Sequence, residues 1–390
     1  MMRFLVTRMS VLSVVAFIAV ITACAPSASG AAPATGPVAV AGTPFDRAAQ
    51  IDQLAAAVLG NEITGAIVSI ADPAHGTHLK AYGTADAAGT PMTVEMHYRI
   101  ASVSKTFTAH AVLELAGQGK LSLDDPLARF VPDIPHGEAI TVRDLLGLRG
   151  GVYDFATDPG LLAPYQADPT LPGWSPDNAL QIIRAHPDKA LAPRTDTVYS
   201  NSEYILLGYV IERASGKPAP DYLAGLIERM GLPATSFPTG TALPAPFSRG
   251  YIATGEPPSA AAPPRDATAS NPLVPWTAGA LVSTVPDMTR YAPLMAAGAG
   301  LPPELAAQRQ TWTRMSAEAI PLQYGLGVQK VGDWVGHDGT MLGYSNMVFH
   351  RPATGTTVVV MVNAVSMSSA PAADLWLKVV QLLYPDSVPL

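Results

Sequence analysis

Cysteine and charged residues are both scarce in this sequence. Cys24 is the only cysteine among 390 residues, so the chain cannot form an internal disulfide bond. Charged residues make up 14% of the chain and hydrophobic residues 48%, which indicates a globular protein with a large core and argues against a disordered one. Acidic residues outnumber basic residues by 31 to 24. This negative excess makes nucleic acid a poor candidate partner.

Two signatures of other enzyme classes are also absent. The eight histidines show no metal-ligand pattern such as His-Glu-x-x-His, and we predict no metal site and no cofactor. The sequence has no Gly-x-Ser-x-Gly elbow, since Gly-Tyr-Ser-Asn-Met at residues 343–347 fails at its last position. This absence counts against an α/β-hydrolase.

The apolar run near the N-terminus is too short for a membrane-spanning helix. It covers 11 residues, 11–21, and follows Arg3 and Arg8, as in a signal peptide. The run ends in Ile-Thr-Ala-Cys24, which resembles a bacterial lipobox. We therefore predict a lipoprotein signal peptide at residues 1–23 and lipidation of Cys24. Ordinary cleavage nearby is the alternative.

Residues 24–45 contain neither periodicity nor charge. They are predicted to form a flexible tether of about 20 residues between the lipid anchor and a folded domain. The expected location is that of an exported lipoprotein on a bacterial cell membrane, facing the cell envelope. Because the chain is acidic, membrane attachment would depend on the acyl chains and not on anionic lipid headgroups.

The remaining residues, 46–390, are predicted to form one domain. Patterns typical of helices occur at 46–59 and 372–383, and patterns typical of strands at 66–71, 79–83, 347–350 and 356–362. The middle of the chain is dominated by helical patterns. We predict the α/β (α+β) class, in which a mixed, largely antiparallel sheet comes from about 46–105 and 280–390. Helices would cover both faces, with an inserted helical subdomain at about 106–279.

A serine and a lysine with catalytic spacing occur in Ser-Val-Ser-Lys at residues 102–105. On a helix, this spacing places the first hydroxyl and the amine on one face, so Ser102 could be a nucleophile and Lys105 its base. The alternatives are a helix-capping serine and a solvated surface lysine. The apolar neighbours Val103 and Phe107 favour a partly buried Lys105 with a lowered pKa.

Two motifs far along the chain strengthen this pair. Tyr-Ser-Asn at residues 199–201 precedes a helical pattern, and His-Asp-Gly-Thr at residues 337–340 lies in a strand pattern. Each has a competitor, because Tyr-Ser-Asn recurs at 344–346 and Lys-Val-Gly at 330–332 could replace the third motif. We favour the motif at 199–201 because a helix follows Tyr199. We favour the motif at 337–340 because a hydroxyl residue follows its glycine.

In chain order, Ser-x-x-Lys, Tyr-x-Asn and His-x-Gly resemble the penicillin-recognising serine hydrolases: class C β-lactamases, DD-carboxypeptidases and related esterases. The resemblance runs from about residue 46 to the C-terminus and includes residues 118–126, 140–146, 278–284 and 324–327. It is closest to the DD-carboxypeptidase branch, in which the third motif also begins with histidine. It implies a β-lactamase/DD-peptidase-like fold with the active site where the sheet meets the helical subdomain.

The resemblance also implies two-step acyl transfer. Ser102 would attack a substrate carbonyl after Lys105 accepts its proton, and Tyr199 would relay the proton to the leaving group. The backbone N–H groups of Ser102 and Thr340 would form the oxyanion hole. His337 would orient the Tyr199 hydroxyl and keep the local potential positive.

Other residues are expected to contact the substrate. The resemblance implies that Asn201 holds the acyl amide, and that Trp276 lines the cleft wall with Trp174 facing it. The missing side chain at Gly339 would leave room for a substrate backbone beside the strand.

Two residues depart from the carboxypeptidase pattern. Asp338 stands where a threonine usually meets the substrate's carboxylate, and Gln329 stands where some carboxypeptidases carry a carboxylate-binding arginine. An acidic group at this place repels a free carboxylate.

Three functions therefore remain open. One is a DD-carboxypeptidase-like or penicillin-binding hydrolase of the cell envelope, with a peptidoglycan-type peptide as substrate. Another is an esterase or D-amino-amide hydrolase that acts on a small molecule and needs no carboxylate on its substrate. Asp338 and Gln329 favour this second function. The third, a non-catalytic envelope binding protein, gains no specific support because every catalytic position is filled.

Overall fold

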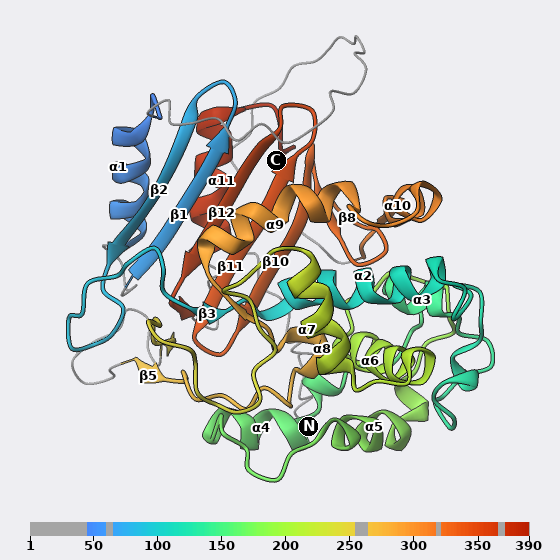
Figure 1. The fold of residues 1–390 in the computed structure, drawn as a ribbon. Helices are drawn as coiled ribbons and strands as arrows, with labels where there is room; N and C mark the ends of the chain where they lie inside the picture. Colours follow the sequence, from blue (N-terminus) through green and yellow to red (C-terminus); the bar gives the residue numbers. More distant parts are fainter. Residues whose placement is uncertain (1–44, 60–64, 254–263, 317–320, 366–370, 390) are drawn as a thin grey trace, which may run out of the picture.

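An eight-stranded sheet forms the centre of the structure (Figure 1). Its order is β2-β1-β12-β11-β10-β9-β8-β7, and every neighbouring pair is antiparallel. The strands are β1 (Gly65–Asp72), β2 (Gly76–Gly83), β7 (Thr313–Arg314), β8 (Leu322–Tyr324), β9 (Gln329–Val331), β10 (Trp334–Met341), β11 (Tyr344–Arg351) and β12 (Thr356–Val362). Two strands precede the helical region in the sequence and six follow it, so both parts of the chain build one sheet.

This computed structural model describes residues 45–59, 65–253, 264–316, 321–365 and 371–389. The predicted signal peptide, Cys24 and the predicted tether up to residue 44 lie outside the described residues. Within the ranges just given, no helix has both the length and the apolar composition needed to cross a membrane.

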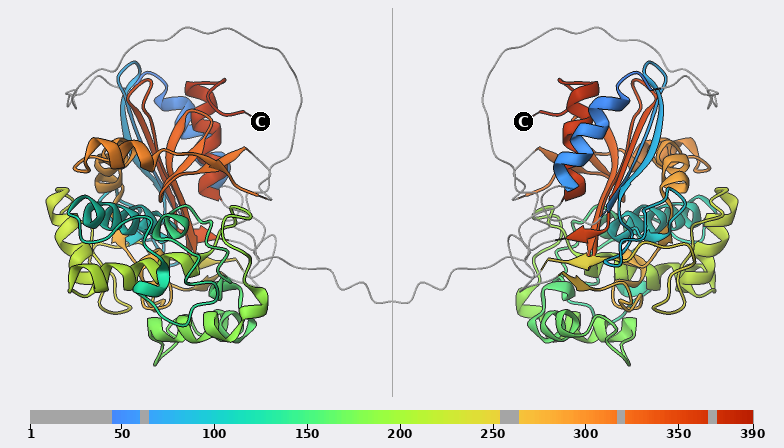
Figure 2. Two further views of the ribbon diagram at one scale, coloured as in Figure 1. Left: turned by 90° about the vertical axis from the view of Figure 1, so that its right-hand side faces the viewer. Right: turned by 90° about the vertical axis from the view of Figure 1, so that its left-hand side faces the viewer.

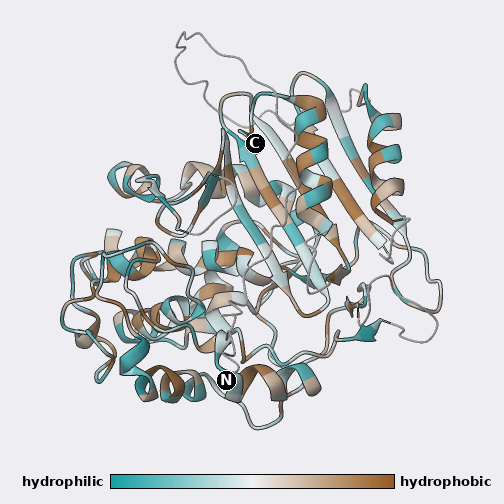
Figure 3. Ribbon diagram, turned by 180° about the vertical axis from the view of Figure 1, so that it is seen from behind, coloured by the Kyte–Doolittle hydropathy of each residue, from teal (hydrophilic) through white to brown (hydrophobic). Residues whose placement is uncertain are grey.

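Helices cover both faces of the sheet (Figure 2). One face carries α1 (Ala48–Leu59) and α11 (Pro371–Leu383), and the other carries α9 (Val285–Ala297). Seen from behind, α1 and α11 both display hydrophobic and hydrophilic residues (Figure 3). Leu375 and Val379 of α11 are four residues apart and buried, as expected for the apolar side of a helix that packs on a sheet. β12 lies between these layers and is buried along its whole length.

A group of helices packs beside one end of the sheet. They are α2 (Ser104–Gly117), α3 (Val142–Leu146), α4 (Pro159–Ala167), α5 (Pro176–Ala185), α6 (Asn201–Ser215), α7 (Ala219–Arg229), α8 (Trp276–Gly279) and α10 (Pro303–Arg309). α2 is central, since it packs against α6, α7 and α8, and it is buried on nearly all sides. Apolar and small residues occur on all sides of α2, and Lys105 and His110 are buried among them.

Two small sheets complete the described structure. β3 (Tyr98–Arg99) pairs with β6 (Val282–Ser283), and β4 (Tyr251–Ile252) lies between β5 (Arg265–Asp266) and β13 (Ala364–Val365). β13 and β4 are parallel, whereas the large sheet is antiparallel throughout. The predicted fold class, with a largely antiparallel sheet, helices on both faces and a helical region, is confirmed.

Candidate active site

Ser102 lies on a sharp turn between a strand and a buried helix. β3 ends at Arg99, a 3-10 turn follows at Ala101–Val103 (the Ser102 turn), and α2 begins directly after it. Ala101 has a φ of 50°, a left-handed conformation that is strained for a residue other than glycine. The N-cap of α2 is Val103, so the helix-capping alternative for Ser102 is wrong. The turn leaves the Ser102 side chain partly exposed.

Lys105 is fully buried on the first turn of α2. Its Nζ lies 3.0 Å from Ser102 Oγ, 2.8 Å from Asn201 Oδ1 and 2.9 Å from the carbonyl oxygen of Ala278. The solvated-lysine alternative is therefore wrong, and the amine has three fixed neighbours.

Burial also sets the charge of Lys105. Loss of solvation lowers the pKa of Lys105 to about 7, although the negative charges of Asp154 and Asp338 act in the opposite direction. A neutral amine has two N–H donors and one lone pair. If the donors serve Asn201 and Ala278, the lone pair faces the Ser102 hydroxyl, which is the arrangement that a general base requires.

The side-chain amide of Asn201 is held at both ends. Its Oδ1 accepts a hydrogen bond from Lys105, and its Nδ2 donates to Asp154 Oδ2 at 3.1 Å. The Asn201 backbone N–H also donates to Asp154 Oδ1, at 3.1 Å. The Asn201 side chain, which was predicted to hold the substrate's acyl amide, is thus engaged by the lysine through its oxygen, and Asn201 orients Lys105.

Sequence reasoning missed Asp154, which belongs to none of the three motifs and lies 47 residues before Asn201. An acidic residue between the aromatic residues Tyr153 and Phe155 was the only signal. Burial raises the pKa of Asp154, while hydrogen bonds from Ala156 and Asn201 act against this rise. Asp154 fixes which end of the Asn201 amide faces Lys105.

The loop that carries Asp154 is fastened to the start of α6 by consecutive side chains. Besides the Asn201 contacts, Ser200 Oγ donates to the Val152 carbonyl oxygen at 2.9 Å. Ser202 Oγ accepts a hydrogen bond from the Phe155 N–H at 2.9 Å. Glu203 Oε2 accepts one from the Gly150 N–H at 3.2 Å. Four residues in a row at 200–203 therefore position residues 150–155. Burial keeps the pKa of Glu203 well above its usual value.

Tyr199 precedes α6 and lies beside Lys105 and His337. Lys105 Nζ is 4.8 Å from the centre of the Tyr199 ring, and the centres of the Tyr199 and His337 rings are 6.4 Å apart. Burial raises the pKa of Tyr199 well above its usual value, against the opposing effect of a hydrogen bond with Ser102. Tyr199 therefore keeps its proton near pH 7 and is suited to donate it.

Both ring nitrogens of His337 face groups other than Tyr199. Nδ1 lies 2.6 Å from the carbonyl oxygen of Asp338, and Nε2 lies 3.1 Å from the hydroxyl of Tyr324 on β8. Burial lowers the pKa of His337 to about 4, so the ring is neutral at pH 7. The expectation that His337 makes the local potential positive is wrong, and the contact with Tyr324 was not predicted.

Asp338 and Gln329 form a closed pair of side chains. Gln329 Nε2 donates to Asp338 Oδ1 at 2.7 Å, and the Asp338 backbone N–H donates to Gln329 Oε1 at 3.1 Å. The Asp338 side chain is still 26% exposed. Its charge reaches the catalytic groups, because it contributes to raising the pKa of both Lys105 and Tyr199.

Gly339 lets β10 approach the Ser102 turn. A Cβ atom at Gly339 would lie 2.3 Å from the carbonyl oxygen of Ile100, a contact that backbone atoms cannot relieve without moving. The structure therefore gives this glycine a role in packing of the protein itself, and room for a substrate backbone stays a prediction. Thr340 follows on the same strand and is exposed.

The competing motifs have structural roles. In the second Tyr-Ser-Asn, the Tyr344 hydroxyl donates to the Ser248 carbonyl, and Asn346 Nδ2 donates to the carbonyl oxygens of Arg99 and Gly339. Asn346 thus ties β11 to β3 and β10. Lys330, of the rival third motif, lies with its Nζ 5.8 Å from the centre of the Trp312 ring.

The two tryptophans pack against different aromatic rings. Trp276 is 4% exposed, and its ring packs against Tyr209, with centres 5.0 Å apart, and against Gly208 of α6. Trp276 is therefore a core residue, and its assignment to a cleft wall is wrong. Trp174 is partly buried and stacks on Phe155, with ring centres 6.4 Å apart.

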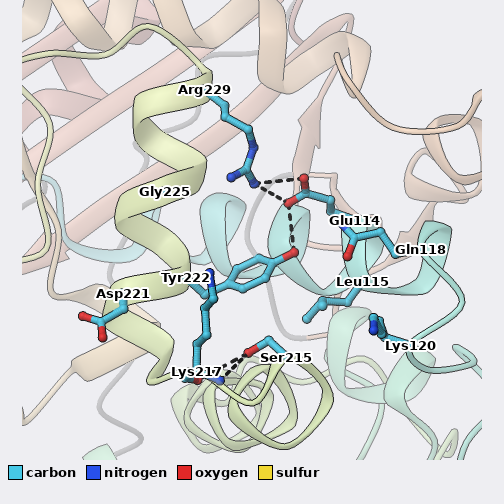
Figure 4. A pocket seen from close by; sticks show the side chains of 10 residues that line it. All are labelled: Glu114, Leu115, Gln118, Lys120, Ser215, Lys217, Asp221, Tyr222, Gly225 and Arg229. Carbon is cyan, nitrogen blue, oxygen red and sulfur yellow. Dashed lines mark hydrogen bonds and ion pairs between the residues drawn. The ribbon is translucent and has the colours of Figure 1, made fainter.

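A separate cavity of about 450 Å³ lies between the ends of α2, α6 and α7 (Figure 4). None of the predicted site residues lines it. On its wall, Glu114 accepts from Arg229 at 2.8 Å and from the Tyr222 hydroxyl at 3.1 Å, which fastens α7 to α2. Across the described ranges, no group of three or more histidine, cysteine, aspartate or glutamate residues could hold a metal ion.

Comparison with known families gives the assignment that the motifs suggested. A family model described as Beta-lactamase matches residues 51–381. The chain belongs to this family. Matches to the first curated relatives span about a third of those relatives' own length.

These similar proteins have different activities. An esterase, EstB of Burkholderia gladioli, is 31% identical over 175 residues, which are 40% of this chain and 42% of the esterase. A penicillin-binding protein of Bacillus subtilis is 27% identical over 133 residues, 34% of this chain and 28% of that protein. The structure of a D-stereospecific amidohydrolase from Streptomyces matches with a TM-score of 0.76 and 26% identity, covering 87% of this chain and 99% of that one. Membership of the beta-lactamase family thus leaves the substrate open.

Proposed function

We propose that this member of the family is a hydrolase that acts through an acyl-enzyme on Ser102. The observation that carries the proposal is the 3.0 Å contact between Ser102 Oγ and the buried Lys105 Nζ. A lysine with a pKa of about 7 is neutral in a substantial fraction of molecules at neutral pH, so it can accept the serine proton.

In the proposed first step, Ser102 Oγ forms a bond to the substrate carbonyl carbon while its proton moves to Lys105 Nζ. The backbone N–H groups of Ser102 and Thr340 are proposed to stabilise the oxyanion, at about 3 kcal/mol for each donor. When the tetrahedral intermediate collapses, the leaving group departs with a proton relayed through Tyr199. Water then attacks the ester carbonyl, Ser102 recovers its proton, and the acid product leaves.

For the substrate, we propose an ester or amide without a carboxylate at the position that Asp338 faces. The Asp338–Gln329 pair supports this, because Asp338 stands where a threonine usually meets the substrate's carboxylate, and Gln329 stands where some carboxypeptidases carry a carboxylate-binding arginine. Like charges about 4 Å apart at a partly exposed site repel by up to about 4 kcal/mol. That energy slows acylation by a carboxylate substrate by two to three decades.

The direct test is replacement of Ser102 by alanine in the purified full-length chain. Hydrolysis of a neutral 4-nitrophenyl ester should fall by at least about 10³-fold, and a covalent acyl adduct seen by mass spectrometry should disappear. Lys105→Ala and Tyr199→Phe should each lose roughly 10²- to 10⁴-fold. The exposed Ser122 offers a matched control, Ser122→Ala, that should keep full activity. Retention of activity by Ser102→Ala would refute the assignment.

The second candidate is a DD-carboxypeptidase-like, penicillin-binding enzyme, which the penicillin-binding relative from Bacillus subtilis favours. A fluorescent penicillin separates the two candidates. Under our proposal the wild-type chain is acylated slowly and Asp338→Thr is acylated faster, while turnover of a neutral ester changes by less than about tenfold. Rapid acylation of the wild type, unchanged in Asp338→Thr, would establish the carboxypeptidase reading instead.

We also propose that the protein is exported and held on a bacterial membrane by lipid on Cys24. The support is the sequence alone: the short apolar run followed by Ile-Thr-Ala-Cys.

A further inference from the structure

We propose that Asp338 makes this site select substrates that carry a positive charge, such as a free ammonium group, close to the scissile bond. The proposal rests on the acyl-transfer function above and names the substrate class more narrowly. It goes beyond exclusion of carboxylates, because it names the charge that a preferred substrate carries.

The charge of Asp338 is not neutralised by a cation among the described residues. Its only ion-pair contact there is with His337, at 3.6 Å, and that ring is neutral at pH 7 because burial lowers its pKa to about 4. Gln329 supplies hydrogen bonds to Asp338 but no charge.

The other titratable groups of the site do not neutralise the charge of Asp338 either. Lys105 on α2 is the cation whose charge couples to Asp338, and it must be neutral in order to activate Ser102. Asp154, on the loop before α4, couples to Lys105 as a second acidic group. Tyr199 keeps its proton and is uncharged. In the reactive state the described residues of the site therefore carry no positive charge and at least one negative charge.

The geometry leaves room for a ligand at this carboxylate. Asp338 Oδ1 accepts from Gln329, whereas Oδ2 has no hydrogen bond to any described residue. The side chain is 26% exposed, so a substrate group can reach it. An ammonium group can donate to Oδ2, and a hydrogen bond between two charged groups is shorter and stronger than one between neutral groups. Solvent and salt weaken the attraction, so we expect selectivity of about ten- to a hundredfold.

Three alanine 4-nitroanilides that differ in one charge provide the test. The free amine is cationic, the N-acetyl form is neutral, and the N-succinyl form is anionic, with one leaving group throughout. Both enantiomers are measured with the purified full-length chain. We expect kcat/KM to fall in the order cationic, neutral, anionic, and the ratio of cationic to neutral to shrink when salt is raised.

Two variants assign this order to Asp338. Asp338→Asn removes the charge but keeps an oxygen for Gln329, and the three substrates should then react within about threefold of one another. Asp333→Asn removes a charge of the same sign from an exposed residue that pairs with Arg351, and it should leave the order unchanged.

The outcomes distinguish the inference from the function on which it rests. Equal rates for the three charges in the wild type, with hydrolysis that still depends on Ser102, overturn the inference alone. Loss of the charge order in both Asp338→Asn and Asp333→Asn also overturns the inference but not the proposed function. If no anilide is cleaved, the test is instead inhibition of neutral ester hydrolysis by propylammonium and by butyrate. Equal inhibition by the two ions contradicts the proposal. Hydrolysis that is independent of Ser102 refutes the function itself.

Discussion

At the scale of single residues, Lys105 exchanges its hydration for contacts with Ser102, Asn201 and Ala278. The protonated form loses more on burial than the neutral form, and this difference lowers its pKa to about 7. Only the neutral form accepts a proton. Activity should therefore be low below pH 7, rise as pH passes through about 7, and reach a plateau above it.

Asp154 offers a test of this electrostatic account. Its negative charge favours protonated Lys105, so removing the charge should lower the Lys105 pKa and shift the rising limb of kcat/KM toward acid. Asp154→Asn should also lower the plateau, because an amide at this position can turn Asn201 and present its Nδ2 to Lys105. The measurement is a pH profile with a neutral ester, and Asp124→Asn on the surface is the control. A lower plateau without a shifted limb would mean that Asp154 acts only as a structural support.

Sequence reasoning found Ser102, Lys105, Tyr199 and His337 because each belongs to a short pattern. It could not find Asp154 or Tyr324, which act through contacts between distant segments and leave no local spacing to recognise. It also misjudged His337 and Trp276, since the sequence shows which side chain is present but not how deeply the fold buries it.

At the scale of elements, the contact between β10 and the Ser102 turn decides where Ser102, the proposed nucleophile, lies. Gly339→Ala should separate the two, because the new Cβ would lie 2.3 Å from the Ile100 carbonyl oxygen. Such overpacking costs about 1–3 kcal/mol in free energy of unfolding and should lower ester hydrolysis. Gly240→Ala is the matched control, since its Cβ would meet nothing within 4 Å. Thermal unfolding and kcat measure both effects, and a Gly339→Ala variant with wild-type stability would contradict the packing argument.

The terminal elements could be predicted from the sequence better than the middle. β1 and β12 are apolar runs that are buried almost throughout, and α11 has an apolar side that packs on the sheet. The 150–155 loop is placed instead by side chains of residues 200–203, which no periodicity records.

At the scale of the whole molecule, the proposed lipid anchor would decide where the protein is held. If Cys24 is lipidated, the wild-type chain should partition into detergent with the membrane fraction, and Cys24→Ala should not. Mass spectrometry of the N-terminal peptide of the mature protein checks this. A mature peptide without any lipid mass in the wild type would remove the lipoprotein proposal.

The pairing of β1 with β12 sets an order of events during synthesis. Ala66 of β1 lies opposite Val362 of β12, so the first strand of the chain waits for the last strand of the large sheet. The hairpin of β1 and β2 emerges early with an apolar edge that has no partner, and closing such a distant contact is slow. Until β12 arrives, that edge can pair with other chains. We therefore expect nascent or truncated chains that end before Thr356 to aggregate or to need a chaperone, whereas the finished chain folds as one sheet.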